Sequence, residues 1–460
     1  MTSEIKQTLS QRIQWAQQHP ALCPAPYNTL DIRHAHQSNQ DVYRTCCCNL
    51  DPELFTPTSE LDPFADIKQQ QNQGEWPSAC YKCQADELQG GQSERVRMFV
   101  EMPQDRLEDF LQNRSIQEYE FRIKFSNFCN LSCRSCSATE SSTWAKVTGE
   151  TVSNEYEVDI SDSDRHWEII TSTIQNTVGQ YTYFVVHFIG GETLIQPGMM
   201  KLLQWMVDQN LAGKITVRLT TALTVNPSQE LMSLLAKFRE VNILLSIDSV
   251  GENYQYVRWP AKFQKIEQNL DTLTQYNQKL TIVSGRKVFR PPWRISVSPV
   301  FSLNNLFYVD QWLSYWFDWY QRHGYAFHSY VATLTLQTEH LDVQALPTQY
   351  RAQLAQYLAT CAEHEIFRAY PEYTAGVYNF LITTINELNN NTYNPELWKQ
   401  YLAHTAFFDK KTKLEFAKFN SRLYNLLTDQ DLALWQKAVE HAAQSSRLTT
   451  AMIFQKHVQS

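Results

Sequence analysis

Three cysteines, Cys129, Cys133 and Cys136, form a Cys-x3-Cys-x2-Cys array in this chain of 460 residues. Thiolates are the usual ligands of iron–sulfur clusters, and a cube of four irons is closed by four of them. Three thiolates leave one iron open to a small molecule, much as catalytic zinc keeps an open position that structural zinc lacks. The count therefore predicts a reactive cluster.

The array follows Phe121–Phe125, where apolar and basic residues alternate as in a strand, and it precedes a polar stretch compatible with a helix. We therefore expect the cysteines on a strand-to-helix loop, where enzymes often place chemistry. A zinc site or a buried group of thiols is the alternative. Zinc usually recruits a paired Cys-x2-Cys or a nearby His, and no His lies between Gly91 and Arg165.

The segment Ser126–Cys136, with Asn130 after the first cysteine, resembles the defining motif of the radical S-adenosylmethionine (SAM) superfamily. The resemblance implies a [4Fe-4S] cluster on the three cysteines, whose open iron chelates the amino and carboxylate groups of SAM and delivers an electron to its sulfonium. It also implies an external electron donor of the flavodoxin or ferredoxin type. Ser135 departs from the bulky residue that usually precedes the last cysteine, so other groups must hold the adenine.

The composition is that of a soluble globular protein, with 43% hydrophobic and 19% charged residues. The formal net charge of -8 argues against a general nucleic-acid or anionic-membrane surface. The start lacks a signal-peptide pattern and no apolar run is long enough to span a bilayer, so a cytoplasmic location is expected. Nine of the ten cysteines precede residue 137 in tight groups, which favours clusters over disulfides.

Three parts are expected: a cysteine-rich part over residues 1–115, an alternating part over 116–340 and a helical part over 341–460. Six strand-like runs alternate with helix-compatible segments in the middle part, which predicts an α/β fold with a parallel sheet and helical crossovers. The family resemblance implies that this sheet is a partial (β/α)6 barrel. The predicted strands are Glu120–Phe125, Tyr183–Ile189, Ile215–Thr220, Asn242–Ile247, Arg294–Pro299 and Tyr325–Leu336.

Gly190, Gly191 and Glu192 end an apolar run with two glycines and a carboxylate, in a chain that has only 13 glycines. This resembles the Gly-Gly-Glu motif of the same superfamily, in which bare backbone and the acid bind the ammonium of SAM at the C-terminal end of the second strand. Barrels of this kind concentrate their active sites at that rim. Alone the motif reads as a plain turn, and Thr193 replaces the proline that often follows it.

Further contacts to SAM are implied by resemblance to later strands. Ser246 and Asp248 match a segment that binds the ribose, and Arg258 matches an arginine that pairs with the methionine carboxylate. The alternative is that Asp248 caps the next helix and Arg258 is a surface charge. Thr221 and Ser298, on the third and fifth strands, are further candidates, although Ala222 stands where relatives carry an amide.

The first hundred residues offer thiols from three separated places: Cys23, the run Cys46, Cys47 and Cys48, and the pair Cys80 and Cys83. With Asp86-Glu87 and Ser93-x-Arg95, they resemble the twitch module, a shortened SPASM domain that binds an auxiliary [4Fe-4S] cluster. Cys23, one member of the run, Cys80 and Cys83 would close that cluster, which suggests electron transfer or structural support. A zinc site with the same four ligands is the alternative.

The resemblance implies a radical enzyme that abstracts hydrogen from a C–H bond, with a peptide or other small metabolite as substrate. Dehydrogenation or epimerisation of a sugar or nucleoside is the alternative activity. Epimerisation needs a hydrogen donor, for which Cys361 is a candidate by elimination, although it also reads as a buried core cysteine. A non-catalytic metal-binding scaffold is the alternative of another class.

Overall fold

The computed structural model of the chain describes most of its residues. The described ranges are 12–35, 40–46, 64–88, 93–102, 104–114, 117–150, 159–283, 293–324, 326–329, 331–332, 336–390 and 393–448.

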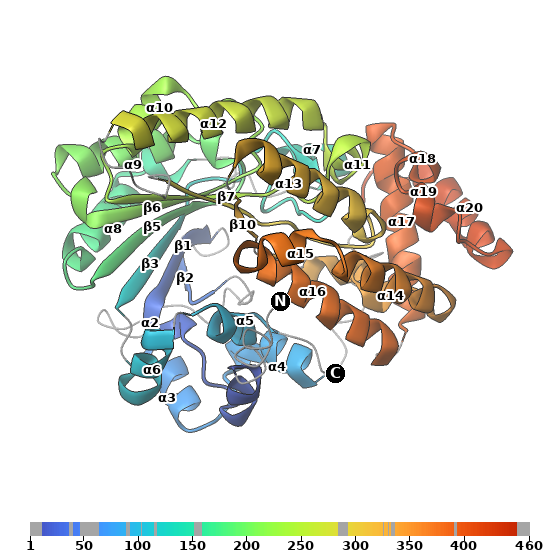
Figure 1. The fold of residues 1–460 in the computed structure, drawn as a ribbon, viewed down its shortest axis with the longest axis horizontal. Coiled ribbons are helices and arrows are strands. Elements are labelled where there is room, and N and C mark those ends of the chain that lie inside the picture. Colours follow the sequence, from blue (N-terminus) through green and yellow to red (C-terminus); the bar gives the residue numbers. More distant parts are fainter. Residues whose placement is uncertain are drawn as a thin grey trace.

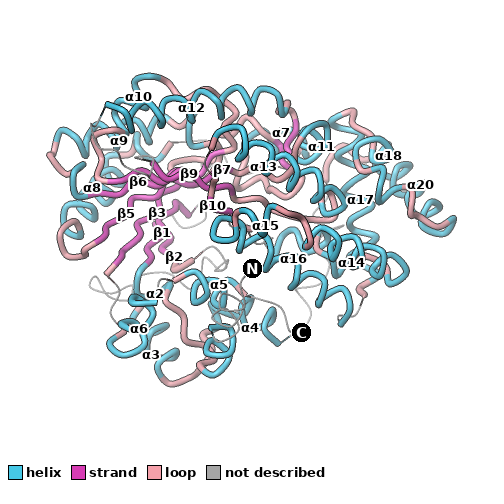
Figure 2. The backbone as a smooth tube through the Cα atoms, in the orientation of Figure 1, coloured by secondary structure: helices cyan, strands magenta, loops and turns pink. Residues whose placement is uncertain are grey.

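An open, twisted sheet forms the centre of the molecule (Figures 1 and 2). Its strands all run parallel except β2, which pairs antiparallel with β1 at one edge. In spatial order the strands are β10 (His328–Ser329), β9 (Trp293–Val297), β7 (Glu240–Leu245), β6 (Ile215–Thr221), β5 (Tyr183–Ile189), β3 (Glu118–Lys124), β1 (Thr29–Ala35) and β2 (Gln40–Arg44).

The predicted α/β class and parallel sheet are confirmed, with differences at the two edges of the sheet. Within Tyr325–Leu336 the strand is only His328–Ser329, and a 3-10 helix, η8 (Leu336–Leu341), begins where the predicted strand ends. At the other edge lie β1 and β2, in the N-terminal part, where no strand was predicted; β1 adds a seventh parallel strand beside β3. Alternation of Leu30 and Ile32 with polar neighbours was the signal that could have found it.

Five helices connect successive parallel strands and cover one face of the sheet (Figure 1). Phe121, Ile123, Val186 and Val217 point from the strands into the core that these helices complete. Burial of this apolar face is the main source of stability for the sheet. The helices are α8 (Asp164–Thr177), α9 (Pro197–Asp208), α10 (Gln229–Leu235), α12 (Phe263–Val283) and α13 (Val309–His323).

The N-terminal helices form a small core of their own. Arg106 on α6 pairs with Glu118 on β3, which ties this core to the sheet. The helices are α2 (Ala25–Asn28), α3 (Ala65–Asn72), α4 (Tyr81–Leu88), α5 (Glu94–Glu101) and α6 (Gln104–Asn113). The core residues are Ala16, Leu22, Val96, Phe99, Leu107 and Phe110.

The predicted C-terminal helical region is confirmed. Helix α14 (Thr348–Ala362) packs against α16 (Pro371–Asn390), and α17 (Pro395–Thr412) packs against α20 (Asp429–Gln444). The short helices α15 (Ile366–Ala369), α18 (Phe416–Phe419) and α19 (Ser421–Tyr424) connect them. In the described part of the chain, no helix is both long and apolar enough to cross a membrane.

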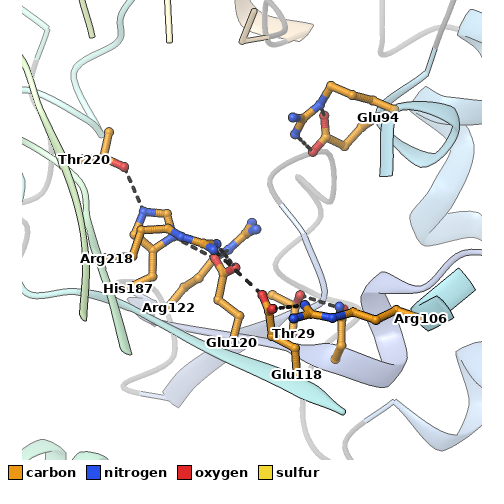
Figure 3. A network of polar contacts seen from close by, with 11 residues as sticks. Thr29, Glu94, Arg106, Glu118, Glu120, Arg122, His187, Arg218 and Thr220 are labelled. Carbon is orange, nitrogen blue, oxygen red and sulfur yellow. Dashed lines mark hydrogen bonds and ion pairs between the residues drawn. The ribbon is translucent and has the colours of Figure 1, made fainter. Parts of the chain in front are cut away.

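The face of the sheet turned away from the crossover helices carries a polar network (Figure 3). Glu120 accepts hydrogen bonds from His187 Nδ1 at 2.7 Å, from Arg122 Nε at 2.6 Å and from Arg218. His187 Nε2 lies 2.8 Å from Thr220 Oγ1. Because the carboxylate occupies Nδ1, the neutral ring carries its hydrogen there and Nε2 accepts from the Thr220 hydroxyl.

Two pKa shifts describe this network. Burial alone would raise the pKa of Glu120, but Arg122, Arg218 and His187 hold it well below its ordinary value. Burial lowers the pKa of His187 to about 4, against the opposing effect of Glu120. Both arginines further disfavour a protonated ring, so His187 is neutral near pH 7.

The neutral His187 should make the protein sensitive to mild acid. The unfolded chain binds a proton on this histidine near pH 6.5, above the folded value, so stability is lost as pH falls below that point. We expect this residue to lower the free energy of unfolding by about 1 kcal/mol between about pH 7.5 and 5.5. The free energy of unfolding, measured with denaturant at several pH values, should fall less steeply with decreasing pH in His187→Gln than in the wild type. Parallel plots of this free energy against pH for the two proteins would contradict the assignment.

Candidate functional site

The cysteine array lies on the loop between β3 and helix α7 (Ser142–Thr148), as predicted. Hydroxyl groups at the start of the helix hold this loop. Ser141 caps α7 and donates to the carbonyl of Leu131, and Thr143 Oγ1 donates to the carbonyl of Cys129 at 2.6 Å. Cys129 N donates to Ser142 Oγ at 3.2 Å. The polar stretch after the cysteines is therefore the support of the loop.

A two-stranded ladder fixes the middle of the loop. Strand β4 (Ser132–Cys133) pairs antiparallel with β8 (Arg258–Trp259), and Cys133 stands opposite Arg258. Arg258 Nη1 lies 3.7 Å from Cys133 Sγ. A segment 125 residues further along the chain thus sets the position of the central cysteine.

Burial raises the pKa of all three thiols, that of Cys129 to about 11 and that of Cys133 to about 12. The pKa of Cys136 is raised well above its ordinary value, by burial first and then by the nearby Cys133 and Cys129. Deprotonating three such neighbours requires positive charge beside them, part of which Arg258 supplies next to Cys133. A bound metal cluster supplies the rest, because metal ligation deprotonates thiols. The donor set therefore fits the predicted cluster.

The Gly190-Gly191 turn touches the cysteine loop directly. Both glycines have positive φ, +80° and +54°. A Cβ on Gly190 would lie 2.4 Å from Lys124 Cγ, and one on Gly191 would lie 2.2 Å from the carbonyl oxygen of Phe128. Glu192 N donates to that same carbonyl at 2.9 Å. Only glycine allows this approach of the turn to the residue before Cys129.

Glu192 is buried and held by four hydrogen bonds. Thr221 Oγ1 and Leu194 N donate to Oε1, while Ala222 N donates to Oε2 at 3.0 Å and Thr224 Oγ1 at 3.4 Å. Burial nevertheless raises its pKa. Thr221, predicted to contact the cofactor, is thus a partner of Glu192, and the backbone of Ala222 contributes where an amide side chain was missing.

Asp248 and Arg258 pair with each other. Arg258 Nε donates to Asp248 Oδ2 at 2.6 Å and Nη2 to Oδ1 at 2.9 Å, and Val300 N also donates to Oδ1. Both residues are buried. Asp248 is not the cap of the next helix, because the N-cap position of α11 (Gly251–Val257) is Val250, and Arg258 is buried rather than a surface charge. The structure brings both beside Cys133, with their charges directed at one another.

Ser246 and Ser298 follow the ends of neighbouring strands β7 and β9. Ser246 N donates to the carbonyl of Thr221 at 2.8 Å and Ser298 N to that of Leu245 at 2.7 Å. Their side chains are partly exposed. The two predicted serines therefore lie at the same C-terminal edge of the sheet as the Gly-Gly-Glu turn.

Sequence reasoning missed several residues of this neighbourhood. Lys124, only 6% exposed, ends β3 and its Nζ donates to the carbonyl of Thr139 at 2.8 Å. The same Thr224 hydroxyl oxygen that contacts Glu192 also lies 3.0 Å from Asn130 Oδ1, which places the loop after β6 beside the cysteine loop. Arg134, between two of the cysteines, is completely buried. A buried charge has no local signature in the sequence, because its partners are distant.

A second group of thiols gathers in the N-terminal part. Burial raises the pKa of Cys23 well above its ordinary value, and the charges of Cys46, Cys80 and Cys83 raise it further. Burial likewise raises the pKa of Cys80 to about 12, with Cys46 and Cys83 acting in the same direction. These predicted ligands therefore share one environment.

The other two members of the cysteine run, Cys47 and Cys48, lie outside the described residues. Within the described ranges, no three or more His, Cys, Asp or Glu residues are arranged to hold a single metal ion.

Glu87, Ser93 and Arg95 hold together the segments that carry two of these thiols. Arg95, 1% exposed, donates to both carboxylate oxygens of Glu87, and Ser93 Oγ donates to the same acid. Nη1 of Arg95 also donates to the carbonyls of His19 and Leu22, at 3.1 and 3.0 Å. The arginine thereby joins helix α4, which carries Cys83, to the segment just before Cys23.

Cys361 lies in the core on α14. Burial raises its pKa to about 11, and its neighbours are Tyr357, Asp310 and Arg422. This environment is that of the buried core cysteine considered above.

Comparisons with known proteins agree with this geometry in part of the chain. A family model described as the radical SAM superfamily matches residues 123–288, which include the cysteine loop, the Gly-Gly-Glu turn and Arg258. No curated protein sequence is significantly similar to the chain.

Two solved structures illustrate the more distant likenesses. "Native anSMEcpe with bound AdoMet" is 16% identical with a TM-score of 0.35, covering 54% of this chain and 62% of its own. SuiB of Streptococcus suis bound to the precursor peptide SuiA is 13% identical with a TM-score of 0.33, covering 63% and 60%. The chain thus matches about three fifths of the length of each.

Gly191→Ala should disrupt the cysteine loop. The left-handed backbone costs a β-carbon about 1–2 kcal/mol, and the contact with Phe128 forces the loop to move. We expect iron content after anaerobic reconstitution to fall toward about half of the wild-type value, with a lower melting temperature. Gly213→Ala is the matched control, because a Cβ there meets nothing within 4 Å. Equal iron content in both variants would contradict the role of the turn.

Proposed function

Because the chain is a radical SAM superfamily enzyme, we propose that it cleaves SAM reductively and uses the 5′-deoxyadenosyl radical to abstract hydrogen from a substrate C–H bond. The observation that carries this proposal is the contact of the three-thiol loop with the Gly-Gly-Glu turn at the C-terminal edge of a parallel sheet. Cys129, Cys133 and Cys136 would hold the [4Fe-4S] cluster, which when bound supplies the electron.

The residues around the loop would have three tasks. The bare backbone of Gly190 and Gly191, with Glu192, would bind the ammonium of SAM, and four hydrogen bonds preorganise that carboxylate. Ser246 and Ser298 offer partly exposed hydroxyls at the same edge for the nucleoside. Asp248 and Arg258, which bind each other, would position Cys133 rather than contact ribose and carboxylate as first expected.

We further propose that Cys23, Cys80, Cys83 and one cysteine of the run at 46–48 hold an auxiliary [4Fe-4S] cluster. Support comes from the burial of Cys23 and Cys83, the partial burial of Cys46 and Cys80, and the mutual electrostatic effect of the four thiols. Four thiolates close a cluster, so it would transfer electrons rather than bind substrate. Zinc at the same thiols is the alternative that metal analysis separates.

A peptide is the proposed substrate class, by resemblance to radical enzymes that carry such modules. The open sheet, taken as a partial barrel, would receive it between the C-terminal rim and the N-terminal helices. Glu120, Arg122, Arg218 and Thr220 make the inner face polar, which suits amide, carboxylate or hydroxyl groups. The same groups suit a sugar or nucleoside, whose dehydrogenation or epimerisation is the second candidate.

Replacing Cys129, Cys133 and Cys136 together by Ala should abolish SAM cleavage. The anaerobically reconstituted, dithionite-reduced wild type should form 5′-deoxyadenosine, measured by liquid chromatography, and the triple variant should form none above background. The variant should keep about four of about eight irons per chain. Undiminished cleavage would refute the assignment of the loop, and retained zinc without iron would replace the auxiliary cluster by a zinc site.

Replacing Cys80 and Cys83 by Ala should uncouple the enzyme. Iron should fall from about eight to about four per chain, some SAM cleavage should remain, and turnover of a candidate peptide encoded beside the gene should be lost. Cys361→Ala is the matched control and should keep the full iron content. Full turnover in the double variant, with the second cluster shown to be missing, would reduce the N-terminal module to a fold stabiliser.

A further inference from the structure

Arg134 stands between Cys133 and Cys136 in the cysteine loop, which is called the cluster loop from here on. Its side chain is nevertheless directed into the protein. It is 1% exposed. Its backbone N donates to the carbonyl of Val257 at 2.9 Å, and its Nε donates to the carbonyl of Tyr256 at 2.8 Å. The guanidinium lies over the Tyr256 ring, 3.7 Å from the centroid. These contacts fix the loop against the segment that leads into β8.

The outer end of the same guanidinium reaches the C-terminal helical region. Nη2 donates to Asp409 Oδ1 at 2.6 Å, and Nη1 donates to the carbonyl of Thr405 at 3.4 Å. Both partners belong to α17, about 270 residues further along the chain. Asp409 Oδ2 also accepts from Phe416 N, the first residue of α18. One carboxylate thus joins the cluster loop to the junction of two C-terminal helices.

We propose that Arg134 is a positioning residue that couples the cluster loop to the C-terminal helical region, so that the environment of the cluster on Cys133 and Cys136 depends on Asp409. This rests on the cluster assignment proposed above. Reduction potentials of iron–sulfur clusters depend on hydrogen bonding to sulfur and on solvent exposure. Both change if the backbone between two ligands shifts. The C-terminal helices, outside the matched residues 123–288, are then part of the cofactor site.

Geometry favours this role over that of an ordinary stabilising ion pair. Arg134 lies one residue after Cys133 and two before Cys136, and Cys136 N donates to the carbonyl of Cys133 at 3.0 Å across it. A displacement of the guanidinium is therefore transmitted to both ligands. By contrast, Arg422 pairs with Asp310 at 2.7 Å in a partly exposed setting, with the two side chains 38% and 42% exposed, and also joins the C-terminal region to α13. That pair provides a matched control.

The test compares full-length Arg134→Met, Asp409→Asn, the double variant and Arg422→Met, each anaerobically reconstituted with iron and sulfide. Electron paramagnetic resonance is recorded after reduction with and without SAM, and the signal that SAM changes is assigned to the cluster with the open iron. The ratio of reduced to oxidised form of that cluster is then measured at fixed potentials. We expect each of the first two variants to change that ratio roughly threefold or more, and the double variant to change it by no more than either. Arg134→Lys should restore part of the effect, and Arg422→Met should match the wild type.

The outcomes distinguish a failure of the proposed function from a failure of the positioning role of Arg134. A wild-type protein that binds no cluster overturns the proposed function itself. A wild type that binds the cluster, with variants of identical spectra and ratios, overturns only the positioning role. Loss of the folded state in both Arg134→Met and Asp409→Asn apoproteins, measured by thermal unfolding, would also overturn it, because the pair would then act on the whole fold.

Discussion

The close approach of the Gly190-Gly191 turn to the carbonyl of Phe128 is the constraint on which the candidate site depends. It places the end of β5 against the residue before Cys129, with no room for a β-carbon. The same carbonyl accepts the backbone hydrogen of Glu192. The three thiols follow β3 and Glu192 follows β5, its neighbour in the sheet. The contact therefore brings them together at the C-terminal edge of the sheet, where Ser246 and Ser298 also lie.

Buried arginines hold several of the cysteine-bearing segments in place. Arg258, paired with Asp248, faces Cys133. Arg134, paired with Asp409, anchors the backbone that follows Cys133. Arg95, paired with Glu87, joins the segments of Cys23 and Cys83. Thiols that must become charged gain from nearby cations, but a cation that is itself paired contributes chiefly geometry. In the proposed function, bound metal would supply most of the compensating charge for the thiols.

The N-terminal part is continuous with the sheet. Strand β1 pairs with β3, the strand that leads into the cluster loop, and the short helix α2 before β1 follows Cys23 directly. The N-terminal set of cysteines and the cysteine loop are therefore connected through adjacent strands of one sheet. The expected division at residue 115 falls between β1 and β3, and the part of the chain before it supplies an edge of the central sheet.

The sequence alone determined the features that depend on local pattern. The spacing of Cys129, Cys133 and Cys136, the Gly-Gly-Glu turn and the alternation of β5 and β6 are short-range signals, and the strands and loop lie where these signals placed them. Tertiary structure decided the pairing of Asp248 with Arg258, the contact of Arg134 with a residue 275 positions away, and the place of β1 beside β3. The physical reason is that the partner of a buried charge or of a parallel strand is chosen by packing between distant segments, and a local pattern carries no record of that choice.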